Sequence, residues 1–245
     1  MIIILTGAGI SQESGIATFR DKNGLWNKVK IEDVATPQAF KKNPKLVHQF
    51  YNQRRRELIS GTIKPNPAHL ALVQLESALK TVAGKTDQGS HKGLFLVTQN
   101  VDNLHEAAGS QQVCHMHGRL CAALCQSCQA RFDWTTDLSQ EDVCPKCQTK
   151  GSLRPDVVWF NEIPYFLDEI QEKLKKCTTF VAIGTSGVVY PAAAFFGQAK
   201  SYGAQTIEIN LEPSQSATSF NRAFYGPASK TVPAWVSEVL ADLGK

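Results

Sequence analysis

The sequence has no apolar run that approaches the roughly 20 residues of a membrane-spanning helix. It also lacks the positively charged start of a secretory signal peptide, and the apolar segment Ile2–Leu5 is far too short for one. The net charge of +4 is mild, and apart from Arg54–Arg56 there is no dense basic stripe of the kind that binds nucleic acid. We therefore expect a cytoplasmic protein with no membrane or nucleic-acid partner, in which Ile2–Leu5 forms a first strand.

A disulfide framework is not expected, because the seven cysteines are an odd number in a chain of cytosolic character. Four of them instead form a CxxC…CxxC pattern with fifteen residues between the two pairs. This spacing is typical of a tetrahedral zinc site, and four thiolates leave no open position, so the ion would be structural. Cys121 is a competing ligand, and a redox pair or a coincidence is the alternative to zinc. The predicted ligands are Cys125, Cys128, Cys144 and Cys147.

A glycine-rich turn, residues 7–11 (GAGIS), follows the first strand. It resembles a strand that turns into a helix with exposed amides, an arrangement that holds phosphate. It is not a complete dinucleotide fingerprint, because Gln12 stands where GxGxxG requires its third glycine. An ordinary tight turn is the alternative. Gly15 then ends the helix early, and the long irregular stretch that follows suggests a cover over a nucleotide.

Four apolar segments end in glycine or small polar residues: 2–5, 94–97, 180–183 and 206–209. Ligands of open α/β sheets bind outside the carboxyl ends of the strands, so four such ends together predict a doubly wound parallel sheet with its crevice there. The most polar end is Thr98–Asn103, although an Asn/Asp-rich turn with Asp102 or Asn103 as N-cap is the simpler alternative. His117 differs from the other histidines because Gly118 follows it, and a glycine allows the backbone to approach a ligand closely.

Helices are predicted from Asn43-Pro44 to about Ile59, from Asn66-Pro67 to about Leu79, and from Pro233 to about Leu243. In the first of these, at about 100° per residue, one apolar arc contains Leu46, Val47, Phe50 and Leu58. Arg54 falls in the middle of this arc and Tyr51 at its edge, with Arg55 and Arg56 outside it. A cation on an apolar stripe requires a partner, which is either an internal carboxylate or a ligand carboxylate that the planar guanidinium recognises.

Taken together, these segments resemble the sirtuins over essentially the whole chain and in the expected order. The resemblance rests on GAGIS (7–11), TFR (18–20), TQNVDNLH (98–105), HMHG (115–118), the two CxxC pairs, VVWFNE (157–162), GTS (184–186) and NLE (210–212). Ala35-Thr36-Pro37 and the Tyr51-xx-Arg54 pair are similar to the class III branch, in particular to its bacterial, CobB-like members. The resemblance implies an NAD-dependent protein-lysine deacylase with a Rossmann-like large part and a small zinc module.

The resemblance also implies where the parts lie. The large part would comprise residues 1–34, 80–118 and 155–245, with a helical insertion at 35–79 and the zinc module at 119–154. His117 would be the general base, with Asn100 and Asp102 beside it as catalytic residues. The implied NAD contacts are Gly7, Ala8, Gly9, Ile10, Ser11, Ala17, Phe19, Arg20, Trp26, Gln99, Asn100, Val101, Asp102, His117, Gly184, Thr185, Ser186, Asn210, Leu211, Glu212 and Ala228.

For the substrate, the resemblance implies an acyl pocket and a backbone clamp on an acyl-lysine-bearing protein. Tyr51 and Arg54 would bind the carboxylate of a succinyl or malonyl chain, for which Ala35 leaves room. The clamp would add the peptide as a strand, between Val157, Val158, Phe160 and Asn161 on one side and Gly187 and Val188 on the other. The products would be nicotinamide, O-acyl-ADP-ribose and free lysine, and we expect a monomer.

Two residues depart from the family pattern: Asn161 stands in place of a usual glycine, and Ala17 in place of a usual polar residue or proline. Because asparagine tolerates positive φ better than most residues, the clamp can survive the first change. Three other functions remain open on the residues alone. They are mono-ADP-ribosyl transfer from the same NAD site, a non-catalytic NAD- or acyl-lysine-binding module, and a zinc-ribbon adaptor.

Overall fold

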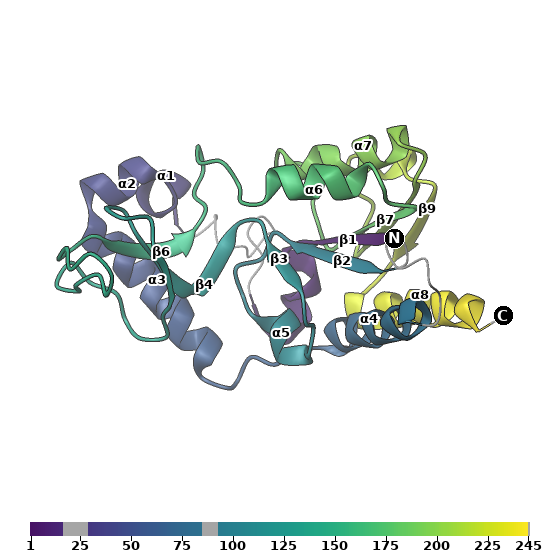
Figure 1. Ribbon diagram of the computed structural model, residues 1–245, viewed down its shortest axis with the longest axis horizontal. Coiled ribbons are helices and arrows are strands. Elements are labelled where there is room, and N and C mark those ends of the chain that lie inside the picture. Colours follow the sequence, from purple (N-terminus) through teal and green to yellow (C-terminus); the bar gives the residue numbers. More distant parts are fainter. Residues whose placement is uncertain (17–28, 85–92, 245) are drawn as a thin grey trace.

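The computed structural model describes residues 1–16, 29–84 and 93–244 (Figure 1). The larger of its two lobes is built on a six-stranded sheet with strand order β3-β2-β1-β7-β8-β9, in which every neighbouring pair is parallel. β1 (Ile2–Thr6) lies between β2 (Leu94–Thr98) and β7 (Thr179–Ile183), so the chain order reverses between β1 and β7. The predicted doubly wound parallel sheet is confirmed, and its topological switch point lies between these two strands.

The sequence predicts four of the six strands in this sheet, including β8 (Gln205–Asn210). The two that it misses, β3 (Val113–His115) and β9 (Arg222–Tyr225), lie at the two edges. β3 has only three residues, and β9 is exposed or half-exposed along its length. Neither strand therefore carries the buried apolar run by which the inner strands are recognised.

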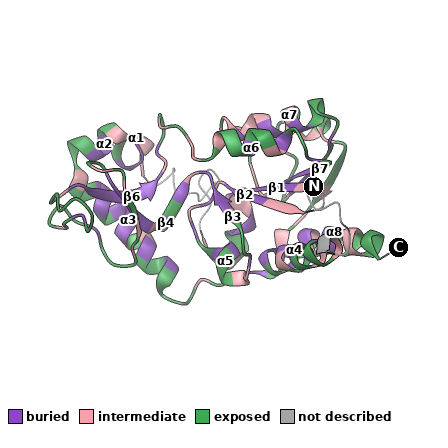
Figure 2. Cartoon of the chain, in the orientation of Figure 1, coloured by how far each residue is buried: buried purple, intermediate pink, exposed green. Residues whose placement is uncertain are grey.

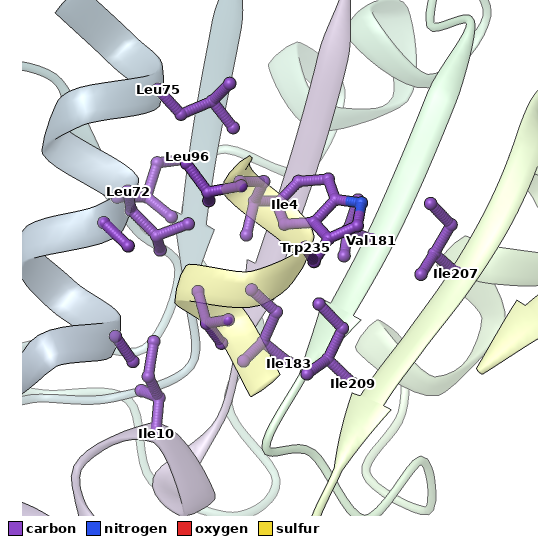
Figure 3. Close-up of a cluster of buried hydrophobic side chains, with 14 of the residues drawn as sticks. Ile4, Ile10, Leu72, Leu75, Leu96, Val181, Ile183, Ile207, Ile209 and Trp235 are labelled. Atoms are coloured by element: carbon purple, nitrogen blue, oxygen red, sulfur yellow. The ribbon is translucent and has the colours of Figure 1, made fainter. Parts of the chain in front are cut away.

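Helices cover both faces of the large sheet, with α4 (Pro67–Gly84), α5 (Leu104–Ala108) and α8 (Ala228–Leu243) on one face (Figure 1). α6 (Leu167–Leu174) and α7 (Phe195–Ser201) cover the other. In Figure 3, Trp235 of α8 and Leu72 of α4 pack together on the strand residues Ile4 and Val181. Residues 67–79, assigned from the sequence to the helical insertion, thus belong to a helix that packs under the large sheet. Short 3-10 turns lie at Ala8–Ile10, Gln12–Ser14, Ala192–Ala194 and Ala217–Ser219.

The predicted start of the last helix is wrong: α8 begins at Ala228 and contains Pro233. Proline in a helix removes one backbone donor, but here the first turn is supported from outside. The carboxylate of Glu13 accepts bonds from the Ser229 amide at 2.8 Å and from the Ser229 hydroxyl at 2.7 Å. This anion caps the positive end of the helix dipole, so the helix begins five residues before the proline.

The smaller lobe combines an antiparallel sheet of order β5-β4-β6 with α1 (Ile31–Val34), α2 (Pro37–Lys42) and α3 (Pro44–Ile59). Its strands are β4 (Gly118–Cys125), β5 (Arg131–Asp133) and β6 (Leu153–Val157). The extended run predicted over 155–162 ends as a strand at Val157, and β6 pairs with β4 rather than with the large sheet.

Figure 2 shows that the inner strands of both lobes are buried whereas the outer faces of the helices are exposed. Within the described ranges, no helix combines the length and the apolar character that crossing a membrane requires.

α3 begins where predicted, with the Asn43 side chain accepting a bond from the Leu46 amide at 3.1 Å. The predicted apolar arc is partly wrong, because Leu46 is 41% exposed whereas Arg55 is fully buried. Arg55 donates to the carbonyls of Leu120 and Thr136 and to the Asn52 side chain, at 2.8–3.2 Å. The face of α3 toward the small sheet is therefore buried but polar, which a count of apolar residues does not detect.

Gly118 enters the small sheet at φ 80°, and a Cβ there would lie 2.0 Å from the carbonyl oxygen of Asp156. Its close approach is thus to β6, not to a ligand as the sequence suggested. We predict that Gly118→Ala lowers the free energy of unfolding by more than about 2 kcal/mol. The measurement is urea-induced unfolding followed by fluorescence and circular dichroism.

The matched control is Gly197→Ala, in the middle of α7, where an added Cβ meets no atom within 4 Å. This variant should match the wild type or gain up to about 1 kcal/mol, because alanine favours helix. Equal stability of the two variants would contradict the steric argument for Gly118.

Candidate active site

A cavity of about 950 Å³ lies where the two lobes meet. The carboxyl ends of β1, β2, β7 and β8 contribute Gly7, Gln99, Gly184 and Asn210 to its wall, and the smaller lobe contributes residues of α3 and of the segment after β6. Its size and its position at the sheet's switch point are those of a ligand site.

The glycine-rich turn forms the floor of the cavity against the turn after β7. The Gly9 amide donates to the Gly184 carbonyl at 2.8 Å, and a Cβ on Gly9 would lie only 2.7 Å from the Gly184 Cα. The turn is a 3-10 turn, and the Gly7 amide is also engaged, by the Ile183 carbonyl at 2.9 Å. The expected set of exposed amides is thus only partly present, because two of them serve to join the β1 and β7 turns.

His117 faces the cavity from the link between the two lobes. Its Nδ1 lies 3.0 Å from the Gln99 carbonyl, which can only accept, so Nδ1 carries the hydrogen and Nε2 carries the lone pair. Burial lowers the pKa of His117. The imidazole is therefore neutral at pH 7, with one nitrogen able to take a proton.

Asn100 lines the same cavity wall as His117, and the glycine-rich turn holds its side chain. Its amide nitrogen donates to the Gly7 carbonyl at 3.0 Å and to the Ser11 hydroxyl at 3.2 Å, while no described residue donates to its Oδ1. Asp102 lies one layer further back and is not part of the cavity wall. Its carboxylate accepts bonds from the Ser11 hydroxyl and the Leu104 amide, both at 3.0 Å, and burial raises its pKa. The second of these bonds forms an Asx-turn just before α5, whose N-cap residue, Asn103, makes no side-chain capping bond.

One end of the cavity is formed by α3, β4 and the segment after β6. Tyr51 is buried there and Arg54 is half-buried, so the structure places both predicted acyl-pocket residues on the cavity wall together with Ala35. The Arg54 guanidinium lies 3.4 Å above the Phe50 ring and donates to the Phe50 carbonyl at 2.8 Å. Among the described residues, no carboxylate lies within ion-pair distance of Arg54. The internal carboxylate that the sequence analysis offered as one possible partner of Arg54 is thus not found among the described residues.

The remaining predicted residues divide into three groups. Sixteen of them line the cavity: Gly7, Ala8, Gly9, Gln99, Val101, Val157, Val158, Phe160, Asn161, Gly184, Thr185, Ser186, Asn210, Leu211, Glu212 and Ala228. Ile10, Ser11, Gly187 and Val188 lie outside the wall. Ala17, Phe19, Arg20 and Trp26 lie outside the described residues.

In the predicted clamp, Asn161 adopts φ 70°, as its tolerance of positive φ allows. Two of the clamp's amides are already engaged, Val158 by the His117 carbonyl at 2.9 Å and Phe160 by the Ala35 carbonyl at 3.0 Å.

Several wall residues were not predicted from the sequence, among them Gln12, Glu13, Phe50, Leu120, Trp159, Val189 and Tyr190. Phe50, Leu120 and Trp159 are buried apolar residues, which a sequence analysis assigns to the hydrophobic core. They belong to the site only because they lie where the two lobes meet. Tyr190 is 77% exposed, and an isolated exposed aromatic carries no signal in a sequence.

The four predicted zinc ligands come together at the far end of the small sheet. The sulfur atoms of Cys125, Cys128, Cys144 and Cys147 all lie within 4.8 Å of one another. The Cys125–Cys147 and Cys128–Cys144 separations are 3.6 and 3.7 Å. A tetrahedral ion with Zn–S bonds of about 2.3 Å requires sulfurs about 3.8 Å apart, so the cluster fits one structural zinc ion. Cys121 is not part of the cluster.

Comparison with known proteins decides the family, since a sequence model described as the Sir2 family matches residues 7–191. The chain belongs to the Sir2 family. It is 53% identical over 243 residues to the NAD-dependent protein deacylase SIR2rp3 of Leishmania major, covering 98% of this chain and 96% of the relative. It is 51% identical over 242 residues to an NAD-dependent protein deacylase of Escherichia coli K12, covering 99% and 83%. A solved Sir2 homologue in complex with ADP ribose superposes at a TM-score of 0.86, with 35% identity and coverage of 99% of this chain and 93% of that one.

The resemblance to the sirtuins is thus confirmed, and the enzyme is an NAD-dependent protein deacylase whose four clustered cysteines form a site for one structural zinc ion.

We predict that Cys144→Ser abolishes the binding of zinc and lowers the melting temperature, because three thiolates hold the ion poorly and Cys144 is buried in the module's core. The measurements are metal content per chain by mass spectrometry and thermal unfolding. Cys121→Ser is the matched control and should retain one zinc ion per chain. Zinc loss in the Cys121 variant, or full zinc content in the Cys144 variant, would contradict this ligand assignment.

Proposed function

We propose that this enzyme removes succinyl and malonyl groups as well as acetyl groups from lysine side chains, with nicotinamide, O-acyl-ADP-ribose and free lysine as products. The observation that carries the proposal is Arg54, a half-buried guanidinium on the cavity wall without a carboxylate partner among the described residues. Burial lowers the pKa of Arg54 but leaves it charged, since arginine starts from a very high value. A carboxylate at the end of an acyl chain supplies the missing partner.

The residues of the wall divide between the two substrates. NAD, when bound, would supply an electrophilic ribose carbon and nicotinamide as the leaving group. Gly7, Ala8, Gly9 and Gly184 line the part of the wall that would hold the phosphates, and Thr185, Asn210 and Glu212 lie on the side suited to adenosine. Phe160 and Asn161 lie where an acyl-lysine peptide enters.

His117 acts as the general base through Nε2, because Nδ1 is committed to the Gln99 carbonyl. Asn100 presents Oδ1 to the cavity while its amide nitrogen is held by Gly7 and Ser11. We infer that Asp102 supports the reaction from behind, by fixing the Ser11 hydroxyl on which Asn100 rests.

None of the seven cysteines forms a disulfide, which suits a reducing compartment, and we infer a cytoplasmic, monomeric enzyme that acts on acyl-lysine proteins.

Arg54→Met should lower the ratio of desuccinylation to deacetylation by at least tenfold, because a charge-assisted hydrogen bond contributes about 1.5–3 kcal/mol. The measurement is kcat/KM by mass spectrometry on one peptide acylated in the two ways at the same lysine. The control is Arg56→Met on the same helix, whose exposed guanidinium pairs with Asp137 at 3.1 Å, and its ratio should not change. An unchanged ratio in the Arg54 variant would refute the acidic-chain pocket.

The pH dependence follows from the lowered pKa of His117. A base works in its neutral form, so activity is lost only as the pH falls through this lowered value. We predict that the acidic limb of the kcat/KM profile lies below pH 6.5, the ordinary pKa of histidine.

His117→Ala should lower kcat by at least about 100-fold for either acyl group while NAD still binds in calorimetry. A limb at or above pH 6.5, or full turnover by the His117 variant, would refute the assignment of the base.

A further inference from the structure

Trp159 lines the acyl end of the cavity and is 2% exposed. Its indole Nε1 donates a hydrogen bond to the Tyr51 hydroxyl oxygen at 3.0 Å. An indole N–H can only donate, so the direction of this bond is fixed. Tyr51 therefore acts as acceptor toward Trp159 and must use its own O–H as a donor elsewhere.

That second bond has no acceptor within the described part of the chain, since the contact with Trp159 is the one hydrogen bond that Tyr51 makes there through its side chain. Burial raises the pKa of Tyr51 above its usual value, so the phenol keeps its proton. One helical turn away, Arg54 presents a guanidinium. This end of the cavity thus offers the Tyr51 hydroxyl as a donor and a positive charge that has no carboxylate partner among the described residues, and a neutral acyl chain supplies no anion to pair with that charge.

The indole itself is held in place by a partly buried ion pair. Arg154, 4% exposed, makes a bidentate contact with Glu162 at 2.7 and 2.8 Å. The same carboxylate accepts a bond from the Trp159 backbone amide at 2.8 Å, and the Arg154 guanidinium lies 3.6 Å from the centre of an indole ring. Backbone and ring are both fixed, so the N–H stays aimed at Tyr51.

We propose that Trp159 is a positioning residue for acyl specificity: by occupying the acceptor side of the Tyr51 hydroxyl, it commits Tyr51 to donate to the carboxylate of an acidic acyl chain. This inference rests on the proposed acidic-chain pocket. Without the Trp159 N–H, the Tyr51 hydroxyl turns more freely and accepts as readily as it donates. The selectivity for acidic chains then falls although the pocket keeps its charge.

The test is a double-mutant cycle with Trp159→Phe, Tyr51→Phe and the double variant, in the full-length enzyme loaded with zinc. The measured quantity is the ratio of kcat/KM for a succinylated peptide to that for the acetylated peptide. Trp159→Phe should lower this ratio roughly three- to tenfold, the value of one hydrogen bond, chiefly by raising KM for the succinylated peptide. In the Tyr51→Phe background the same substitution should lower the ratio no further, because it acts through the hydroxyl.

Trp159→Phe also leaves space in a packed region, so a second variant separates packing from hydrogen bonding. Site-specific incorporation of benzothienylalanine at 159 keeps the bicyclic shape and replaces the N–H by sulfur, and it should lower the ratio to the same extent.

Three results would overturn the inference: an unchanged ratio in the benzothienylalanine protein, an equal loss in both Tyr51 backgrounds, or a parallel fall of both activities without a change in the ratio. The proposed pocket fails separately, when Arg54→Met leaves the ratio of the wild type unaltered. If Arg54→Met lowers the ratio but the Trp159 variants leave it unchanged, the pocket is supported and the role of Trp159 is refuted.

Discussion

The turns that follow β1 and β7 approach each other more closely than any side chain would allow. A Cβ on Gly9 would overlap the Gly184 backbone, and the Gly9 amide is bonded to the Gly184 carbonyl. This contact lies at the switch point of a doubly wound sheet, where the reversal of strand order places the crevice at the carboxyl ends of the strands. Asn100, which rests on the Gly7 carbonyl, and Asn210, which donates to the Thr185 carbonyl at 3.0 Å, are both placed by these two turns. The cavity floor is thus a backbone structure, and its shape depends little on flexible side chains.

The second element of the site is the passage of the chain from one lobe to the other. β3 ends at His115 in the large sheet and β4 begins at Gly118 in the small one, so His117 lies in the two-residue link between them. The Gln99 carbonyl fixes its ring from the large lobe, and Val158 donates to its carbonyl from the small lobe. A base in this position faces ligands held by either lobe. The proposed general base thus lies where the two sheets join, within reach of both substrates.

How far the sequence predicts this arrangement depends on the kind of signal. The zinc ligands follow from spacing alone, because two CxxC pairs leave few other geometries, and the sheet follows from four apolar segments with polar ends. The buried face of α3 could not be predicted in the same way, since Arg55 is buried by carbonyls of β4 and of the segment near Thr136, far away in the sequence. Trp159 was missed for a related reason. Buried aromatics usually mean core, and only the bond of its N–H to Tyr51 distinguishes it.

The central claim is that the acyl end of the cavity recognises a negative charge through Tyr51 and Arg54. Among the described residues, the Tyr51 hydroxyl has no acceptor and the Arg54 guanidinium has no carboxylate partner. The most direct measurement compares the wild-type enzyme on two peptides that differ only at the end of the acyl chain, a succinyl group and its uncharged terminal amide of the same length. The account predicts a kcat/KM at least about tenfold higher for the succinyl peptide, because a charged acceptor gains more from Tyr51 and Arg54 than a neutral one. Equal rates on the two peptides would contradict the account, since length alone would then decide which acyl chains are removed.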